Sequence, residues 1–126
     1  MIGSSADNVW EVIGDFETGP SRMAPGFVVR TSIDGGIRIV MFADGTVARE
    51  RFVSVDHESR RIVYSVIGDA TGPAHDNASM QVFADGNESC RLVWIHDLLP
   101  DELAPSIEAA MSQGLAVIEK TLAGRR

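Results

Sequence analysis

The chain has 126 residues, of which 44% are hydrophobic and 23% charged, a composition that excludes a disordered chain and predicts one domain over residues 1–126. A formal net charge of -7 disfavours nucleic acid as a partner. The sequence shows no apolar run of about 18 residues and no secretory leader pattern, so we expect a cytoplasmic protein without membrane insertion. The single cysteine, Cys90, excludes an intrachain disulfide. Composition leaves monomer and homodimer both open.

Two helical signals open the chain. Apolar residues recur at helical intervals behind a serine cap and predict a helix from about Ala6 to Asp15. The next segment, ETGPSRMAPGF, is rich in proline and glycine. It therefore predicts a loop that contains at most one helical turn around residues 21–24.

Between Phe27 and Leu99, short β-branched runs alternate with the turn signals DGG, ADG, DHESR, GDATGP and ADGNE. This pattern predicts six strands, over about 27–33, 37–42, 46–55, 61–67, 75–83 and 89–99. Because the connections have the length of hairpin turns, the strands should form an antiparallel meander.

An apolar stripe with helical spacing predicts a long amphipathic helix over about Asp101 to Ala123, which would cover the apolar face of the sheet. The predicted fold class is therefore α+β. Small side chains occupy the middle of this helix: Ala109, Ala110, Gly114 and Ala116. Their low volume predicts a cavity between the helix and the sheet.

Three strings occur in a recognisable order: ADNVWEVIGDF in the first helix, ERFVSVDHESRRIVYSVIGD at 50–69, and WIHDLLP before the last helix. They resemble the START-like or SRPBCC helix-grip superfamily, which includes polyketide cyclase/dehydrase-like proteins, the birch pollen allergen family and plant abscisic acid receptors. The resemblance spans nearly the whole chain. It implies a curved antiparallel sheet of six to seven strands wrapped around a long C-terminal helix, with a ligand cavity between them. Only MIGSS precedes the first helix, so we expect a very short or incomplete first strand.

The resemblance also implies a ligand class, because relatives use such cavities for lipids, sterols, polyketides and hormones. Similarity to the abscisic acid receptors places a pocket glutamate at Glu50 and a pocket aromatic residue at Tyr64. The receptors' pocket lysine has no counterpart, since Val29 stands at its place. Their gate loop is replaced by FADG at 42–45, and their latch loop keeps only His75, so a hormone-gated switch is not expected.

Period-two alternation predicts which side chains face the cavity. The expected ligand-binding residues are Glu50, Phe52, Tyr64, Val66, Asn77, Ser79, Leu92, Trp94 and His96 from the strands, and Met111 and Gly114 from the last helix. Plain core packing is the alternative interpretation for the apolar members of this set.

Glu50 and His96 are the candidate catalytic residues. An inward carboxylate is costly to bury unless it is paired or protonated. Glu50 therefore either acts as a general base or ligand anchor, or pairs with Arg49, Arg51 or Arg38. His96 offers an imidazole beside the apolar Trp94 and suits the enolisation or dehydration of a polyketide-like substrate, the alternative being a satisfied core or rim histidine.

The remaining signals do not support other chemistries. His75 is either a ligand contact or an exposed loop residue, and His57 is expected in a turn. The three histidines lack the spacing of a metal site, so no metal is expected. GDATGPAH lacks the lysine of a phosphate loop, and no cofactor is expected.

The preferred hypothesis is that the domain binds a small apolar or amphipathic molecule of lipid, polyketide or aromatic type. The alternative is a polyketide cyclase/dehydrase-type enzyme in which Glu50 or His96 moves a proton. A third possibility is a structural or partner-binding domain whose core is filled.

Overall fold

The sheet is a six-stranded antiparallel meander in which every strand pairs with its neighbour in sequence. The computed structural model describes residues 1–68 and 73–124. The strands are β1 (Val28–Asp34), β2 (Ile37–Phe42), β3 (Val47–Asp56), β4 (Arg61–Ile67), β5 (His75–Asp85) and β6 (Ser89–Leu99). The predicted meander is therefore confirmed, while the turn expected at 68–73 falls mostly on residues 69–72, outside the described residues.

The helices are α1 (Ala6–Ile13), α2 (Gly19–Met23) and α3 (Ala104–Leu122), with a short 3-10 helix η1 (Asp101–Leu103) before α3. The Ser5 hydroxyl accepts a hydrogen bond from the Asn8 amide and begins α1. A proline in the first turn fits the start of α3 at Ala104. Among the described helices, none is both long and apolar enough to cross a membrane.

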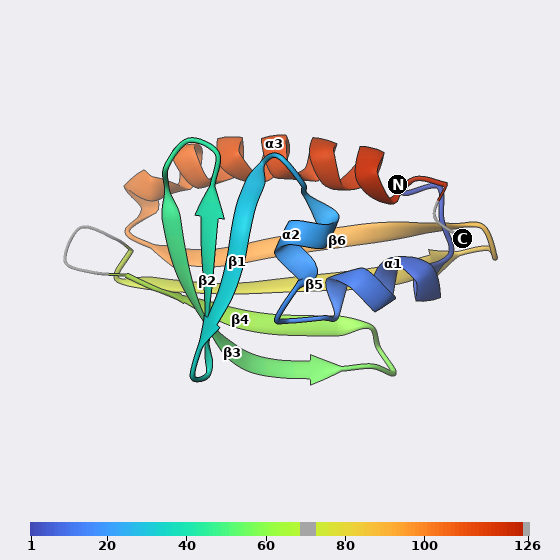
Figure 1. Cartoon of the computed structure of the whole chain (residues 1–126), viewed down its shortest axis with the longest axis horizontal. Helices are drawn as coiled ribbons and strands as arrows, with labels where there is room; N and C mark the ends of the chain where they lie inside the picture. Colours follow the sequence, from blue (N-terminus) through green and yellow to red (C-terminus); the bar gives the residue numbers. More distant parts are fainter. Residues whose placement is uncertain (69–72, 125–126) are drawn as a thin grey trace.

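The long helix α3 lies along one face of the curved sheet, and α1 and α2 lie beside it (Figure 1). In place of a full first strand, Ile2 makes a single antiparallel bridge to Cys90 on β6. The two described ends of the chain meet, because the Gly124 amide donates to the Gly3 carbonyl at 2.8 Å. The fold is the helix-grip α+β arrangement that the sequence predicts.

The densest part of the core lies at the end of the sheet where α1 packs on β5 and β6. Large side chains there are almost completely shielded from solvent, among them Val9, Ile13, Val82, Ile118 and Leu122. In the first half of α3, by contrast, Ile107 and Met111 are only partly buried. The sheet and helix are thus well packed at one end and loosely packed at the other.

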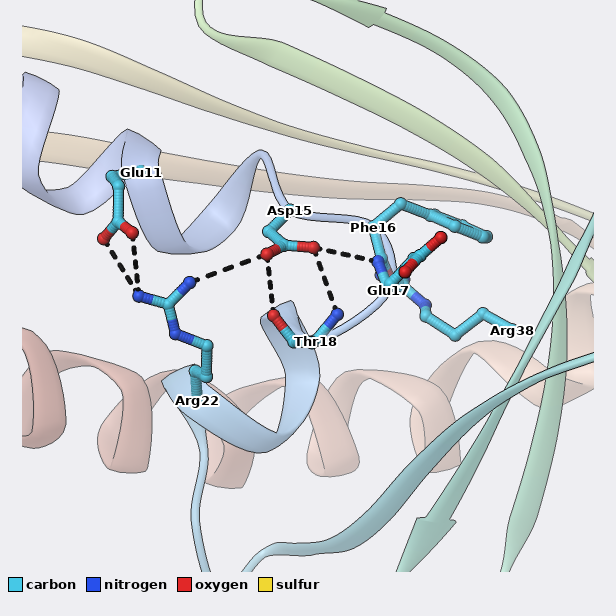
Figure 2. A network of polar contacts seen from close by, with 7 residues as sticks. All are labelled: Glu11, Asp15, Phe16, Glu17, Thr18, Arg22 and Arg38. Carbon is cyan, nitrogen blue, oxygen red and sulfur yellow. Dashed lines mark hydrogen bonds and ion pairs between the residues drawn. The ribbon is translucent and has the colours of Figure 1, made fainter.

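A surface network ties α2 to α1 (Figure 2). The Arg22 guanidinium donates to Glu11 at 2.9 and 3.0 Å and lies 3.6 Å from Asp15. Asp15 accepts hydrogen bonds from the Thr18 amide and hydroxyl. Exposed ion pairs contribute only about 0–1 kcal/mol each. These ion pairs instead hold the segment between α1 and α2 in place. This segment carries Phe16, whose carbonyl reaches the interior.

Candidate ligand-binding site

A cavity of about 860 Å³ lies between the first half of α3 and the inner face of the sheet. A smaller space of about 50 Å³ shares Glu50, Tyr64 and Trp94 with it and is closed by Gly114 and Ile118. A volume of several hundred cubic ångströms is typical of small-molecule sites. The hollow that the small residues of α3 predict is therefore present.

Aromatic and aliphatic side chains form most of the cavity wall. Phe27 and Phe42 pack edge to face with ring centroids 5.4 Å apart. Trp94 contributes from β6, and Ile107 and Met111 contribute from α3. Gly114 lines the smaller space and packs closely on two rings, because a Cβ there would lie 3.3 Å from the Phe27 ring and 3.4 Å from the Trp94 ring.

A buried ion pair borders the two spaces, since Glu50 lines both of them and Arg38 lines only the smaller one. Arg38 on β2 and Glu50 on β3 face each other across the ladder, and their side chains are almost fully shielded from solvent. Arg38 Nε donates to Glu50 Oε1 at 2.8 Å, and Arg38 Nη2 lies 2.6 Å from the same oxygen. Arg38 Nη1 donates to the Phe16 carbonyl at 3.0 Å. Each nitrogen of the guanidinium therefore has a described partner, which accounts for three of its five N–H groups.

Two aromatic rings stack on the Arg38 guanidinium, Phe16 at 4.4 Å and Tyr64 at 4.9 Å from carbon to centroid. Burial raises the pKa of Glu50, and the Arg38 charge opposes that rise. A guanidinium stays protonated in proteins. A neutral Glu50 would thus leave this buried cation without a counter-charge, and for this reason we treat the pair as ionic at neutral pH.

A hydrogen bond joins Trp94 and Tyr64, whose strands are separated by β5. Trp94 Nε1 donates to the Tyr64 hydroxyl at 3.1 Å. Burial is the largest cause of a raised pKa for Tyr64, so the phenol stays protonated. No described residue accepts a hydrogen bond from the Tyr64 hydroxyl, so its hydrogen is available to the cavity.

The third polar group is a close contact between Asp76 on β5 and His96 on β6. The two residues are diagonal neighbours on one face of the sheet, since Ala78 is the direct partner of His96. The Asp76 Oδ1 and His96 Nδ1 atoms are 2.7 Å apart, and Asp76 is 2% exposed. An ionised carboxylate can only accept, so Nδ1 carries the hydrogen, and in the neutral form of the ring Nε2 then keeps its lone pair.

Solvent must reach two further acceptor atoms of the site. Within the described residues, no buried side-chain nitrogen or oxygen lacks a hydrogen-bond partner. Glu50 Oε2 and His96 Nε2 receive no hydrogen bond from any described residue, and both side chains line the cavity. The buried part of the cavity wall therefore presents two acceptors and the Tyr64 hydroxyl to an incoming molecule, and the exposed part adds Asp44, Thr46, Arg49 and Gln113.

The structure brings most of the predicted site residues together. The larger cavity is lined by Glu50, Tyr64, Val66, Trp94, His96 and Met111, and Gly114 lines the smaller space. The pairing of Glu50 with an arginine, one of the two interpretations left open for it, is observed with Arg38. His75 is exposed and His57 accepts a hydrogen bond from Trp10 Nε1 near the β3–β4 turn.

Four of the predicted ligand contacts line neither space. Phe52 keeps the parity of Glu50 and is the ladder partner of Tyr64, but it packs on the Phe16 ring and is 40% exposed. Asn77 is exposed and Ser79 is outward-facing, since the inner face of β5 carries the residues of the opposite parity. Leu92 faces inward but packs on the core and lines neither space.

Sequence reasoning missed Asp76 and did not single out Arg38 as a site residue. A signal for Asp76 was available, because it shares its parity on β5 with Ala78, Met80 and Val82, an apolar set that marks the inner face. Phe27 and Phe42 were also missed; both lie at strand ends, where alternation is a weak guide. Among the described residues no group of three or more potential metal-ligating side chains clusters.

Comparison with known proteins gives the family. A family model described as polyketide cyclase/dehydrase and lipid transport matches residues 1–123. None of the curated proteins matches this chain. The match to the family model confirms the resemblance that the three sequence strings indicate.

Solved structures with the same fold come from bacteria and plants. An uncharacterised protein from Bacillus thuringiensis is 22% identical, with a TM-score of 0.80 over 96% of this chain and 93% of its own. Norcoclaurine synthase from Thalictrum flavum is 23% identical, with a TM-score of 0.67 over 96% and 88%. An aromatase/cyclase from a Streptomyces species is 21% identical, with a TM-score of 0.69 over 96% and 86%. At these identities the likeness establishes the fold.

Proposed function

The chain belongs to the polyketide cyclase/dehydrase and lipid transport family, and from this premise we propose that it binds a small apolar or amphipathic molecule between the sheet and α3. The observation that carries the proposal is the cavity of about 860 Å³, whose wall is aromatic and aliphatic and whose polar groups are few. This combination is characteristic of small-molecule sites, where apolar contact supplies affinity and polar groups supply orientation.

The expected affinity follows from the size of the space. A ligand that buries roughly 300 Å² of apolar surface gains about 7 kcal/mol at about 25 cal/mol per Å². Lost translational and rotational freedom offsets several kcal/mol of that gain. The net result, about 4 kcal/mol, is a dissociation constant of about a millimolar for a ligand that buries only this area, with tighter binding for a ligand that fills more of the cavity.

The test uses the uncharged fluorophore N-phenylnaphthylamine, whose emission rises in an apolar environment. We expect saturable binding at one site per chain, and we expect native mass spectrometry of protein purified from its own host to show a bound small molecule. Absence of saturable binding together with an unliganded mass would contradict the proposal.

A second candidate function is the enolisation or dehydration of a bound carbonyl compound. The contact between Asp76 and His96 favours it, because a carboxylate that holds Nδ1–H orients the ring and leaves Nε2 as a base facing the cavity. Glu50 is less suited to this role, since its charge is held by Arg38. In this function His96 accepts the proton and Asp76 positions the ring.

The measurement for this second function is the exchange of the α-hydrogens of 2-tetralone in deuterated water, followed by proton NMR. If His96 is the base, His96→Gln should slow the protein-catalysed exchange by about 100-fold and Asp76→Asn by a smaller factor, with binding of the ketone retained. His75→Gln, which changes an exposed histidine outside the cavity lining, is the matched control. Equal rates in His96→Gln and wild type would exclude His96 as the base.

A further inference from the structure

We propose that the Arg38–Glu50 pair makes the cavity selective for uncharged, hydroxyl-bearing aromatic ligands and against carboxylates. The inference rests on the proposed binding function and names the ligand class for that same site. It follows from what each polar group in the cavity is still able to bond.

The first step is that the buried cation beside the cavity is already paired and shielded, because the Arg38 side chain is 5% exposed and lines only the smaller space. Nε and Nη2 of Arg38 contact Glu50 Oε1, and Nη1 donates to the Phe16 carbonyl. The rings of Phe16 and Tyr64 cover the guanidinium at 4.4 and 4.9 Å. A carboxylate ligand would have to displace Glu50 to reach this charge, which would leave Glu50 buried and unpaired.

The second step concerns the remaining charges around the space. Glu50 and Asp76 both line the cavity, and both are almost fully buried. Arg49 is the only Lys or Arg among the described residues that line the larger cavity, and it is exposed at the opposite parity of β3 from Glu50. An anion placed deep inside would therefore face two buried carboxylates at low dielectric, with its only lining cation at an exposed position.

The third step is that the available atoms suit a hydroxyl. Tyr64 has a hydrogen to donate, while Glu50 Oε2 and His96 Nε2 can accept. A hydroxyl group both donates and accepts, so one such group can satisfy a donor and an acceptor of the site together. A carboxylate can only accept and would leave the acceptors of the site unmatched.

The positive charge of Arg38 makes the proposal testable, because a substitution at Glu50 can remove its counter-charge. In a Glu50→Gln variant the side chain can still accept a hydrogen bond from Arg38, but it no longer neutralises the guanidinium. The cavity then holds a buried cation without a counter-charge, which a carboxylate ligand can supply. The preference of the site should therefore reverse.

The experiment compares three fluorescent probes with the same aromatic body: pyrene, hydroxypyrene and pyrenecarboxylate, at pH 7. For the wild-type protein we expect hydroxypyrene to bind most tightly and pyrenecarboxylate at least about tenfold more weakly. In Glu50→Gln, pyrenecarboxylate should gain at least about tenfold in affinity. Thermal unfolding and circular dichroism verify that the variant is folded.

Two variants act as controls. The double variant Arg38→Met with Glu50→Gln removes both charges, so pyrenecarboxylate should remain a weak ligand if Arg38 supplies the gain. Glu88→Gln removes one negative charge from the exposed β5–β6 turn and should leave the order of the three probes unchanged.

The outcomes separate the two proposals. Wild-type protein that binds pyrenecarboxylate as tightly as hydroxypyrene overturns the selectivity while binding itself stands. A folded Glu50→Gln protein without a gain for pyrenecarboxylate also overturns it. If Glu50→Gln does not fold, the order of affinities in the wild type decides. Failure of N-phenylnaphthylamine and of all three pyrenes to bind removes the binding function itself.

Discussion

The two halves of α3 lie on the same sheet and yet have opposite surroundings. In the second half, Ile118 and Leu122 are each 2% exposed and belong to the core cluster with α1. In the first half, Ile107 and Met111 line the open cavity. Both halves carry apolar residues at helical spacing, so the difference arises from the neighbouring elements. The segment from Ile2 through α1 fills one end of the sheet, and the other end is left hollow.

The largest expected effect is a difference in the free energy of unfolding between substitutions in the two halves of α3. Ile118→Ala should lower the free energy of unfolding by about 2–5 kcal/mol, because it opens a void in a packed core. Ile107→Ala on the same helix should cost less than about 1 kcal/mol, because its side chain already borders open space. Urea denaturation followed by circular dichroism measures both. Equal losses would contradict the division of α3 into a packed and an open half.

A second prediction fills the hollow end. Ala110 lines the cavity, whereas its neighbour Ala109 is exposed and outside the lining. Ala110→Phe should weaken N-phenylnaphthylamine binding by about tenfold, because the ring occupies ligand volume, and stability should change by less than about 1 kcal/mol. Ala109→Phe should change neither quantity appreciably. Fluorescence titration of the two variants tests the difference, and comparable weakening by both would place the ligand elsewhere.

The smallest expected effect compares the turns at the two ends of the sheet. Asp44 accepts a hydrogen bond from the Thr46 amide, and Asp56 accepts one from the Glu58 amide. Hydrogen bonds hold the pKa of each carboxyl below its usual value. Because the folded pKa is the lower one, each contributes stability above about pH 3.8 that is lost as the pH falls through the folded pKa.

Substitution by asparagine should therefore lower stability slightly at pH 7, and the difference from wild type should vanish at acidic pH. Thermal unfolding across a pH series measures this for Asp44→Asn and Asp56→Asn. Only Asp44→Asn should also alter probe binding, since Asp44 lines the cavity. A stability difference that grows on acidification would contradict the assigned direction of the pKa shifts.

Strand β5 shows how well the alternation of apolar and polar residues predicts the inner face of a strand. Its apolar residues Ala78, Met80 and Val82 share one parity, and that parity faces inward as expected for a half-buried strand. The prediction of Asn77 and Ser79 as ligand contacts assigned the opposite parity of this strand to the inner face. Asp76 contacts His96 because it lies on the inner face of β5, and the polar character of a residue alone does not predict such a contact.

The sequence by itself determined the meander, the long final helix and the inner face of β6, because hydrophobic period and turn residues act over a few neighbouring positions. Only the tertiary structure decided that Arg38 is the partner of Glu50 and that Phe52 packs on Phe16. It also decided that Asp76 holds His96. These contacts depend on strand register and on distant elements packed against the sheet, and no local pattern contains that information.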